Sequence, residues 1–284
     1  MLTPQSLTEA ELDPCMTDPA PDRWYAERDL STTFAKGLRV LSAFDEHTRQ
    51  RSIPDIVQVT GLDRASVRRL VITLVDAGYL EKVGRGFVLT SRVLSHAGAY
   101  LRSNNVGTAV QPILNHFAAE LGLAISLASL NGDAAIYVAA STLRDSTVSL
   151  GFTVGSRLPL LHTAIGRGLL AFGPPHVARR LIAQDPLTHH TGTTLMDRDA
   201  IRADVDQIRD KGYALVRGEF EAGVAGLAVP VGSPGRCRFV IGISAPMDRF
   251  EDAKTLSRDI GLLQQCAAQL DRTGVLSGDP AADH

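Results

Sequence analysis

The feature that most constrains this sequence is a pair of amphipathic helix patterns joined by a short turn, within residues 52–78. The first pattern opens with Ser52 and has Asp55 in its first turn, a combination that is typical of a capped helix start. Gly61 is placed to end it, and Asp63 is placed to cap the second pattern. Apolar residues recur at helical spacing, namely Ile56 and Val59 in the first pattern and Val67, Leu70, Val71 and Leu74 in the second. Two helices joined by a glycine-containing turn of this length predict a helix-turn-helix motif.

The segments on both sides extend this motif. A preceding helix pattern has the apolar positions Phe34, Leu38, Leu41 and Phe44. After the motif, two short apolar segments, 79–83 and 87–89, are joined by Gly84-Arg85-Gly86, which predicts a β-hairpin that acts as a wing. Val93, Leu94, Ala97 and Leu101 then continue as an amphipathic helix. We therefore predict a winged helix-turn-helix over residues 31–90 and a linker helix over residues 91–105.

The charge distribution favours nucleic acid as the partner of this segment. The whole chain has a net charge of −2, but basic residues outnumber acidic ones between residues 49 and 92. The face of the second helix opposite its apolar positions carries Arg64, Ala65, Ser66, Arg68, Arg69, Ile72 and Thr73. Arginine can read guanine and serine can bond to phosphate or to a base edge, so we predict DNA contacts here, with Lys36, Lys82 and Arg85 on phosphates. The alternatives are a solvated helix face and ordinary surface charges.

The remaining composition bounds the class of protein. A chain of 284 residues suggests two domains, and 44% hydrophobic with 21% charged residues is typical of a globular protein. No apolar run approaches the roughly 20 residues that span a bilayer, and residues 1–25 lack the pattern of a secretory signal, so we predict a cytoplasmic protein. Residues 1–30 are predicted to be a flexible acidic arm, and residues 273–284 a disordered tail. Cys15, Cys237 and Cys266 are too scattered for a disulfide framework or a CxxC zinc site.

The second domain, residues 106–272, alternates between strand and helix patterns. We expect strands at 124–130, 134–140, 147–150, 225–231 and 237–244, and helices at 107–121, 163–172, 175–184, 197–211 and 254–270. Asn131-Gly132-Asp133 joins the first two strands as a tight hairpin. Neighbouring hairpin strands between long helices predict an α+β fold and not a parallel dinucleotide-binding fold.

Several segments in order along residues 31–272 resemble the IclR family of bacterial regulators. They are FAKGLRVL at 34–41, LVDAGYL at 74–80, GSRLP at 155–159, TAIGRGLLA at 163–171 and GVAGLAVP at 223–230. FAKGL and GSRLP are most similar to the branch that regulates protocatechuate and 4-hydroxybenzoate catabolism. The resemblance implies a winged helix, a linker helix and a GAF/PAS-like effector-binding domain, assembled as a homodimer or tetramer. The chain departs from the family pattern near the expected effector pocket, with Ala140 in place of arginine and His162 in place of a small residue or cysteine.

An anionic effector is the ligand that the second domain best suits. The predicted pocket residues are Arg144, Gly151, Gly155, Ser156, Arg157, His162, Thr163, Glu219 and Ser244. The glycines and Ser156 can present backbone N–H groups, the arginines supply positive charge, and Thr163 opens a helix whose N-terminus favours a carboxylate. Ser244 is placed by the resemblance. Arg157 has an ion-pair partner as its alternative role, Arg144 a solvated position, His162 a place in the core, and Glu219 a loop cap.

Other functions find little support. No phosphate-binding loop, HExxH motif or nucleophile elbow is present, so we predict neither an enzyme nor a cofactor. His189-His190 lies in a polar loop without neighbouring ligands, so we predict no metal site. The prediction is a DNA-binding transcriptional regulator that responds to a small organic acid, namely an aromatic carboxylate, in the control of aromatic-acid catabolism. The alternatives are an enzyme, or a scaffold, in which the helix-turn-helix serves only for docking.

Overall fold

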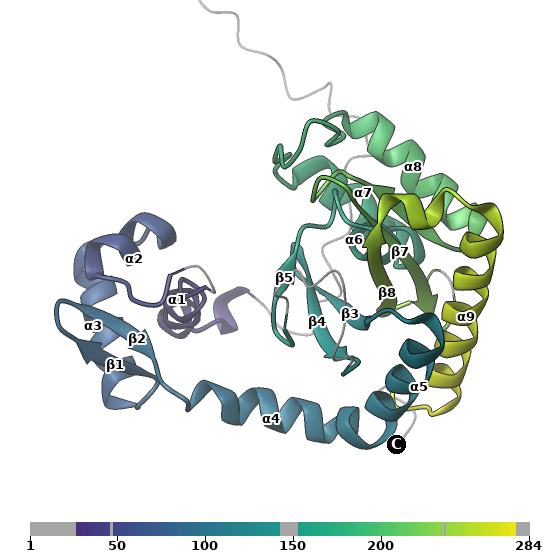
Figure 1. Cartoon of the computed structure of the whole chain (residues 1–284). Coiled ribbons are helices and arrows are strands. Elements are labelled where there is room, and N and C mark those ends of the chain that lie inside the picture. Colours follow the sequence, from purple (N-terminus) through teal and green to yellow (C-terminus); the bar gives the residue numbers. More distant parts are fainter. Residues whose placement is uncertain (1–26, 46–47, 143–152, 234, 236, 277–284) are drawn as a thin grey trace, which may run out of the picture. The chain divides into compact units, whose positions relative to one another are not determined.

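The computed structural model describes residues 27–45, 48–142, 153–233, 235 and 237–276 (Figure 1). The chain divides into two compact units, residues 1–93 and 94–284, and each is described by itself below. The expected strand at 147–150 lies outside the described residues, as do Arg144 and Gly151.

The first unit is a winged helix. After a 3-10 turn η2 (Glu27–Asp29), its elements are α1 (Thr32–Leu41), α2 (Ile53–Thr60), α3 (Arg64–Asp76), β1 (Leu80–Val83) and β2 (Gly86–Leu89). Ser52 and Asp55 form a reciprocal capping box at the start of α2, and Gly61 ends that helix in the left-handed conformation (φ 66°). The carboxylate of Asp63 accepts a 2.8 Å hydrogen bond from the Ser66 N–H at the start of α3. These caps confirm the predicted helix boundaries.

The core of this unit is small and fixes the three helices against the wing. Val40, Ile56, Val67, Val71 and Leu80 are each at most 2% exposed. The backbone of the segment before α2 also pairs with the wing. The Arg51 N–H donates to the Phe87 carbonyl at 3.0 Å, and the Phe87 N–H donates back to Arg51 at 2.8 Å. The hairpin is therefore held to the helical part by main-chain bonds as well as by packing.

A six-stranded antiparallel sheet forms the centre of the second unit. Its spatial order is β5-β4-β3-β8-β7-β6. The strands are β3 (Ile125–Asn131), β4 (Ala134–Ala140), β5 (Arg157–Leu158), β6 (Ala214–Arg217), β7 (Val224–Val231) and β8 (Phe239–Pro246). The predicted hairpin of β3 and β4 is confirmed, and so are β7 and β8 within two residues. The sequence reading missed β5 and β6, which lie at the two edges of the sheet.

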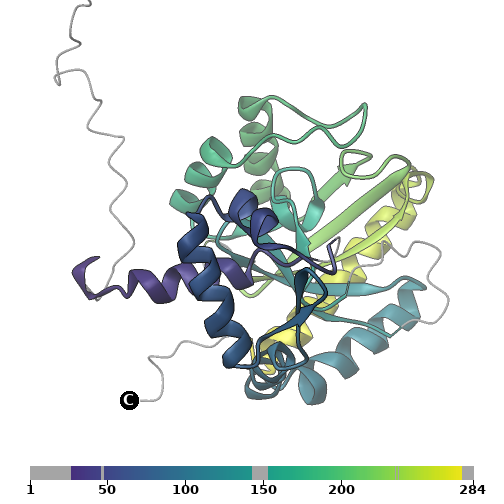
Figure 2. The same ribbon diagram turned by 90° about the vertical axis from the view of Figure 1, so that its left-hand side faces the viewer.

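Helices cover both faces of this sheet, so the unit has three layers. On one face lie α5 (Gln111–Leu121) and α9 (Ala253–Arg272), and on the other lie α6 (Ala164–Phe172), α7 (Pro175–Gln184) and α8 (Arg198–Lys211). The short 3-10 helix η4 (Met247–Phe250) follows β8. In both views the yellow helix α9 lies alongside the strands of the sheet (Figures 1 and 2). Residues that alternate along a strand therefore enter different cores.

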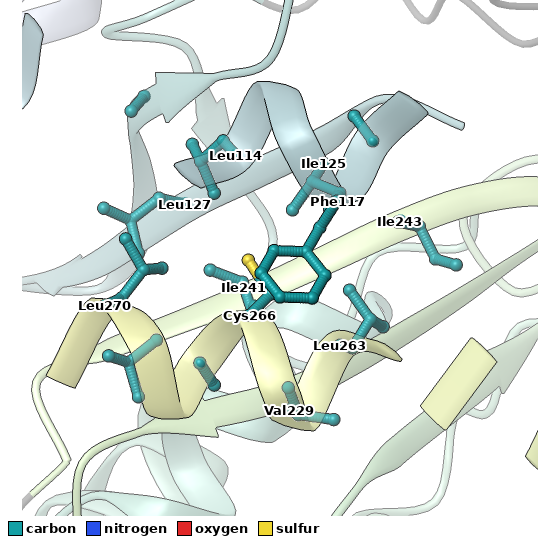
Figure 3. Close-up of a cluster of buried hydrophobic side chains, with 14 of the residues drawn as sticks. Leu114, Phe117, Ile125, Leu127, Val229, Ile241, Ile243, Leu263, Cys266 and Leu270 are labelled. Atoms are coloured by element: carbon teal, nitrogen blue, oxygen red, sulfur yellow. The ribbon is translucent and has the colours of Figure 1, made fainter. Parts of the chain in front are cut away.

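Neighbouring residues of one strand face opposite sides of the sheet and pack into different cores. Leu127 and Ile241 face α5 and α9, where Figure 3 shows them packed around Phe117 and Leu270. Ala128 and Val240, each next in line, face α6, α7 and α8. One cysteine lies in each core, with Cys266 at 0% and Cys237 at 6% exposure. The first core extends to Leu276, which is buried within the segment that the sequence predicted as a tail.

The helix expected over residues 107–121 is present, and it differs from an α-helix only in its first turn. The linker helix α4 (Val93–Ser103) has no buried residue, and a single π-helical turn, η3 (Val106–Val110), lies between it and α5. Pro112 lacks the N–H that would bond to the carbonyl four residues earlier. The N–H of Gln111 instead reaches back five residues to the Val106 carbonyl. The backbone is therefore helical throughout 107–121, and only its first turn is of the π type.

Helix α6 lies unusually close to the sheet and to the segment before it. A Cβ atom on Gly166 would lie 2.4 Å from the Leu160 carbonyl oxygen, and one on Gly242 would lie 2.8 Å from Ile165. A Cβ on Gly226 would meet the Cβ of Ala164 at 3.0 Å. Glycine at these three positions allows α6 to lie close to the sheet and to the segment at Leu160. The N-terminus of α6 is therefore held directly above strands β7 and β8.

Candidate functional site

The first candidate site is the exposed face of α3 and its surroundings in the winged helix. Arg64, Ala65, Arg68 and Arg69 are exposed, and Ser66 is half-buried. Ile72 is a large apolar side chain of the same face and is 51% exposed. The Thr73 hydroxyl donates to the Arg69 carbonyl at 3.0 Å, so it is engaged within the helix. The structure thus leaves a basic and partly apolar face free, as the sequence predicted.

A groove beside α3 brings four of the predicted contacts together. Arg64 and Arg68 line it from α3, while Lys82 and Arg85 line it from the wing. None of these four side chains makes an ion pair within the described part of the chain. Four uncommitted cations around one groove attract an anion such as a phosphate backbone.

Lys36 occupies a different position, on the exposed side of α1. Hydrogen bonds from Ser66 lower the pKa of Asp63, and the charge of Lys36 contributes to this shift to a smaller extent. Lys36 is therefore near the N-terminus of α3. There the Asp63 carboxylate already offsets part of the positive end of the helix dipole.

The second candidate site is a cavity of about 50 Å³ between the N-terminus of α6 and the sheet. Strands β4, β6, β7 and β8 supply its floor, and the loop between β6 and β7 closes one side. The lining residues are Tyr137, Leu158, His162, Thr163, Ala164, Ile165, Val216, Glu219, Phe220, Glu221, Val224, Gly226, Ile243 and Ser244. An apolar floor with a few converging polar groups is typical of a small-molecule site.

Two features prepare the cavity to bind polar atoms of a ligand. Thr163 caps α6, since its hydroxyl accepts from the Gly166 N–H at 3.0 Å and donates to the Pro159 carbonyl at 2.7 Å. The first N–H groups of the helix point to this end and favour an anion. On the sheet, burial raises the pKa of Tyr137 to about 12, and the hydrogen bond with Ser126 opposes this rise only in part. Tyr137 is therefore a protonated phenol.

A buried ion network supports the wall of the cavity. The Arg167 guanidinium donates to Glu219 at 2.6 Å, to Asp204 at 2.8 Å and to the Leu161 carbonyl at 2.8 Å. Burial raises the pKa of Glu219, but the contacts with His162, Arg167 and the Leu195 N–H together hold it below its ordinary value. Glu219 is thus an anion at neutral pH, and Arg167 uses three of its N–H donors within this network.

The structure brings together four of the predicted effector residues: His162, Thr163, Glu219 and Ser244 all line the cavity. Ser156 is buried but bonds to the Thr153 N–H, and Gly155 is exposed in a turn, so neither lines it. Arg157 pairs with Asp133 at 2.7 Å on the surface, which is the alternative role that the sequence left open. These three residues are therefore not part of the cavity wall.

Sequence reasoning missed the aromatic and ionic neighbours of this wall. Tyr137 lies in a strand pattern, and Arg167 lies inside a helix pattern, so neither position gave a local signal. His190 was expected in a surface loop, but its ring stacks edge-on against His162, 5.4 Å away, and against Phe220, 5.0 Å away. The described part of the chain contains no cluster of histidine, cysteine and acidic residues suited to a metal ion. Among its helices, none has the length and apolar character that crossing a bilayer requires.

A winged helix with uncommitted cations and a second unit with a ligand cavity define a DNA-binding regulator that responds to an effector. Comparison with known proteins bears this out. Residues 33–84 match the IclR helix-turn-helix domain, and residues 98–272 match the model described as bacterial transcriptional regulator IclR C-terminal. The chain belongs to the IclR family of transcriptional regulators, which are not enzymes. The family resemblance and the two-domain α+β fold predicted from the sequence are confirmed.

Individual relatives extend over most of the chain. The Pca regulon regulatory protein of Pseudomonas putida is 32% identical over 243 residues, which cover 85% of this chain and 84% of that protein. An IclR-family regulator from Brucella abortus has a similar fold, with a TM-score of 0.72 over 87% of this chain and 94% of that one at 23% identity. The inducer-binding domain of a PobR double mutant from Acinetobacter, solved with 3-hydroxybenzoic acid, is 28% identical, with a TM-score of 0.52 over 57% of this chain and 94% of that one.

Proposed function

We propose that the effector of this regulator is a small aromatic carboxylate and that it controls genes of aromatic-acid catabolism. The observation that carries the proposal is the cavity at the N-terminus of α6, which joins a helix start to an apolar floor. The similarity to the Pca regulon regulatory protein, and to a PobR domain that binds 3-hydroxybenzoic acid, supports it. The protein acts in the cytoplasm, where its operator lies.

The chemistry of the cavity fits such a ligand at both ends. The effector carboxylate accepts hydrogen bonds from the first N–H groups of α6, beside Thr163 and Ser244. The ring lies against the apolar side chains of Val216 and Ile243.

A thermal-shift experiment on the whole protein tests this proposal. We expect 4-hydroxybenzoate, 3-hydroxybenzoate or protocatechuate, at about 100 times its dissociation constant, to stabilise the folded protein by about 2.7 kcal/mol. A Thr163→Val variant, which removes a hydroxyl of the cavity wall, should reduce the shift. No stabilisation by any of these acids would contradict the proposed class of effector.

We further propose that residues 31–90 bind a DNA operator, with residues 91–105 as the linker and residues 106–272 as the effector-binding domain. Arg64, Ala65, Ser66, Arg68, Arg69 and Thr73 approach the major groove, and Lys36, Lys82 and Arg85 approach phosphates. The four uncommitted cations of the groove beside α3 support this assignment.

The Arg69→Ala variant distinguishes base reading from charge attraction. If Arg69 reads a base, we expect operator affinity to fall by about 1–3 kcal/mol and discrimination at one base pair to relax. If it contacts only a phosphate, affinity falls uniformly across sequences. The slope of log affinity against log salt concentration then becomes shallower by about one. Gel-shift titrations at several salt concentrations, with Arg258→Ala on the second unit as control, measure both. Unchanged affinity would remove Arg69 from the interface.

We also propose that the protein binds its operator as a homodimer or a tetramer. Apolar side chains are exposed on two helices, with Phe34 at 67% and Leu38 at 49% on α1, and Leu94 at 65% and Tyr100 at 44% on α4. Such faces are more typical of subunit interfaces than of a free surface. We expect sedimentation to give at least twice the chain mass of 30.4 kDa, and a mass equal to one chain would contradict this assembly.

A further inference from the structure

The groove beside α3 is lined by two kinds of side chain. Its four cations, at positions 64, 68, 82 and 85, have no ion-pair partner within the described part of the chain, and its volume is about 540 Å³. Six of the other lining residues are apolar, namely Ile53, Pro54, Val71, Ile72, Val75 and Phe87. Ile72 is 51% exposed and is therefore open to an apolar partner. A phosphate backbone complements the cations, whereas an acidic peptide with apolar side chains complements both kinds.

Residues 1–26, which precede the described part of the chain, have this composition. Their side chains carry five carboxylates and one arginine, which gives a net charge of −4. The acids are Glu9, Glu11, Asp13, Asp18 and Asp22, and the apolar residues Leu7, Leu12 and Met16 stand among them. Recognition of acidic motifs by clusters of basic side chains is a recurring mode of peptide binding. Residues 1–26 thus match the groove in charge and in apolar character.

The groove is within reach of this segment. Helix α1 follows the segment and packs directly on α3, since a Cβ atom on Gly37 would lie 3.7 Å from the Leu70 side chain. Glu9 is the acid farthest from the described chain and stands 18 residues before Glu27, up to about 60 Å of extended chain. A folded unit of about 60 residues has a radius of gyration of only about 10 Å. A segment tethered in this way competes at an effective concentration on the order of millimolar.

We propose that residues 1–26 bind in the groove beside α3 when no DNA is bound, as an acidic segment that competes with the duplex for the same four cations. The carboxylates of the segment pair with these cations, and its apolar side chains cover Ile72. A duplex that enters the groove must displace the segment, so its apparent affinity is lowered by the same factor whatever its sequence. The competition rests on the proposed assignment of the groove to DNA, whereas the binding of the segment does not.

A spin label on Cys15 tests whether the segment binds the groove. Cys237 and Cys266 are buried, so a thiol-reactive nitroxide attaches to Cys15 in the folded whole protein. We expect a broadened electron paramagnetic resonance spectrum for the wild type without DNA. Charge reversal in the double variant Arg68→Glu, Arg85→Glu should release the segment and sharpen the lines.

The matched control reverses two exposed charges on α7 of the second unit, Arg179→Glu and Arg180→Glu, and should leave the spectrum unchanged. Equal spectra for the wild type and for both double variants would overturn the proposal. If the groove variant does not fold, neutralising the five acids of the segment in the full chain replaces it, because this change should also sharpen the lines. A spectrum that stays broad after neutralisation would equally overturn the proposal.

The neutralised full-length protein also tests the competition with DNA. It carries glutamine at positions 9 and 11 and asparagine at positions 13, 18 and 22. We expect its affinity for a duplex of arbitrary sequence to exceed that of the wild type about tenfold, since four exposed ion pairs of a tethered segment no longer oppose binding. Adding the same duplex to the spin-labelled wild type should sharpen its spectrum as the segment leaves the groove.

The outcomes separate this inference from the proposed function. Equal affinities of the wild type and the neutralised protein would overturn the competition and leave the DNA assignment intact. A gain in affinity while the spectrum of the duplex-bound wild type stays broad would indicate long-range repulsion, and it would also overturn the competition. Absence of duplex binding by both proteins would overturn the DNA assignment, and the spin-label comparison without DNA would still decide whether the segment binds the groove.

Discussion

Replacing Arg167 with methionine is expected to lower the free energy of unfolding of the second unit by about 3–5 kcal/mol, because it leaves Glu219 buried without its cation. Asp204 loses the same partner but is more accessible to water. In a unit of this size the melting temperature should fall by roughly 6–20 °C. Thermal unfolding of the whole protein, followed by circular dichroism, measures the change.

The matched control is Arg202→Met, which removes an exposed arginine paired with Asp199 within α8. Exposed pairs contribute about 0.2–1 kcal/mol, so this change should be small. Equal losses in the two variants would show that the Arg167 network contributes little.

The pH dependence of unfolding gives a second check. The stabilisation by Glu219 is complete above about pH 4.5 and is lost as pH falls through its lowered folded-state pKa. In Arg167→Met burial raises that pKa, so the difference from wild type should narrow toward acid pH.

Replacing Gly166 with alanine is expected to destabilise the second unit by about 3 kcal/mol, near the upper end for overpacking. The added Cβ would lie 2.4 Å from the Leu160 carbonyl oxygen and 2.6 Å from that of Pro159. These are backbone atoms, so no side-chain rotation can relieve the contact, and α6 must move away from the segment before it. Urea denaturation measures the loss, and weaker effector binding should accompany it because the cavity lies at this helix end.

Gly261→Ala in α9 is the control for this prediction. A Cβ there meets no atom within 4 Å. Alanine is favoured over glycine within a helix by about 0.5–1 kcal/mol, so this substitution should stabilise the protein. The same chemical change is thus expected to act in opposite directions at two helical positions. A neutral or stabilising effect of Gly166→Ala would contradict this prediction. It would mean that the backbone at Leu160 can move away without a loss of stability.

Local signals explain which parts of the fold were predictable. Helices α2 and α3 were recognised because Ser52, Asp55, Gly61 and Asp63 mark their ends through contacts within a few residues of the chain. The edge strand β6 has no such marks, since four residues after a helix acquire strand structure only through pairing with β7. The π-helical turn before α5 consists in one shifted bond, from the Gln111 N–H to the Val106 carbonyl five residues earlier, which a periodic apolar pattern does not indicate.

The cavity was predictable only in part for the same reason. Thr163 is visible as a helix cap, and Ser244 and Glu219 lie in segments that resemble the family. Arg167 bonds to carboxylates 37 and 52 residues away, and no spacing rule along the chain connects them. The loop that carries His190 looked polar and exposed, yet Thr191 and Thr194 tie it to the carbonyls of Gly218 and Glu219. Tertiary contacts of this kind decide burial, and sequence patterns do not contain them.

The placement of one cysteine in each core gives the protein an internal probe of its own opening. Burial raises the pKa of both thiols, that of Cys266 to about 12, so neither reacts with a labelling reagent until its layer separates from the sheet. In a Cys15→Ser background, the labelling rate of Cys266 reports the release of α9, and that of Cys237 the release of the opposite layer. Equal rates would mean that the two layers exchange as one cooperative unit, and unequal rates would order them along the unfolding path.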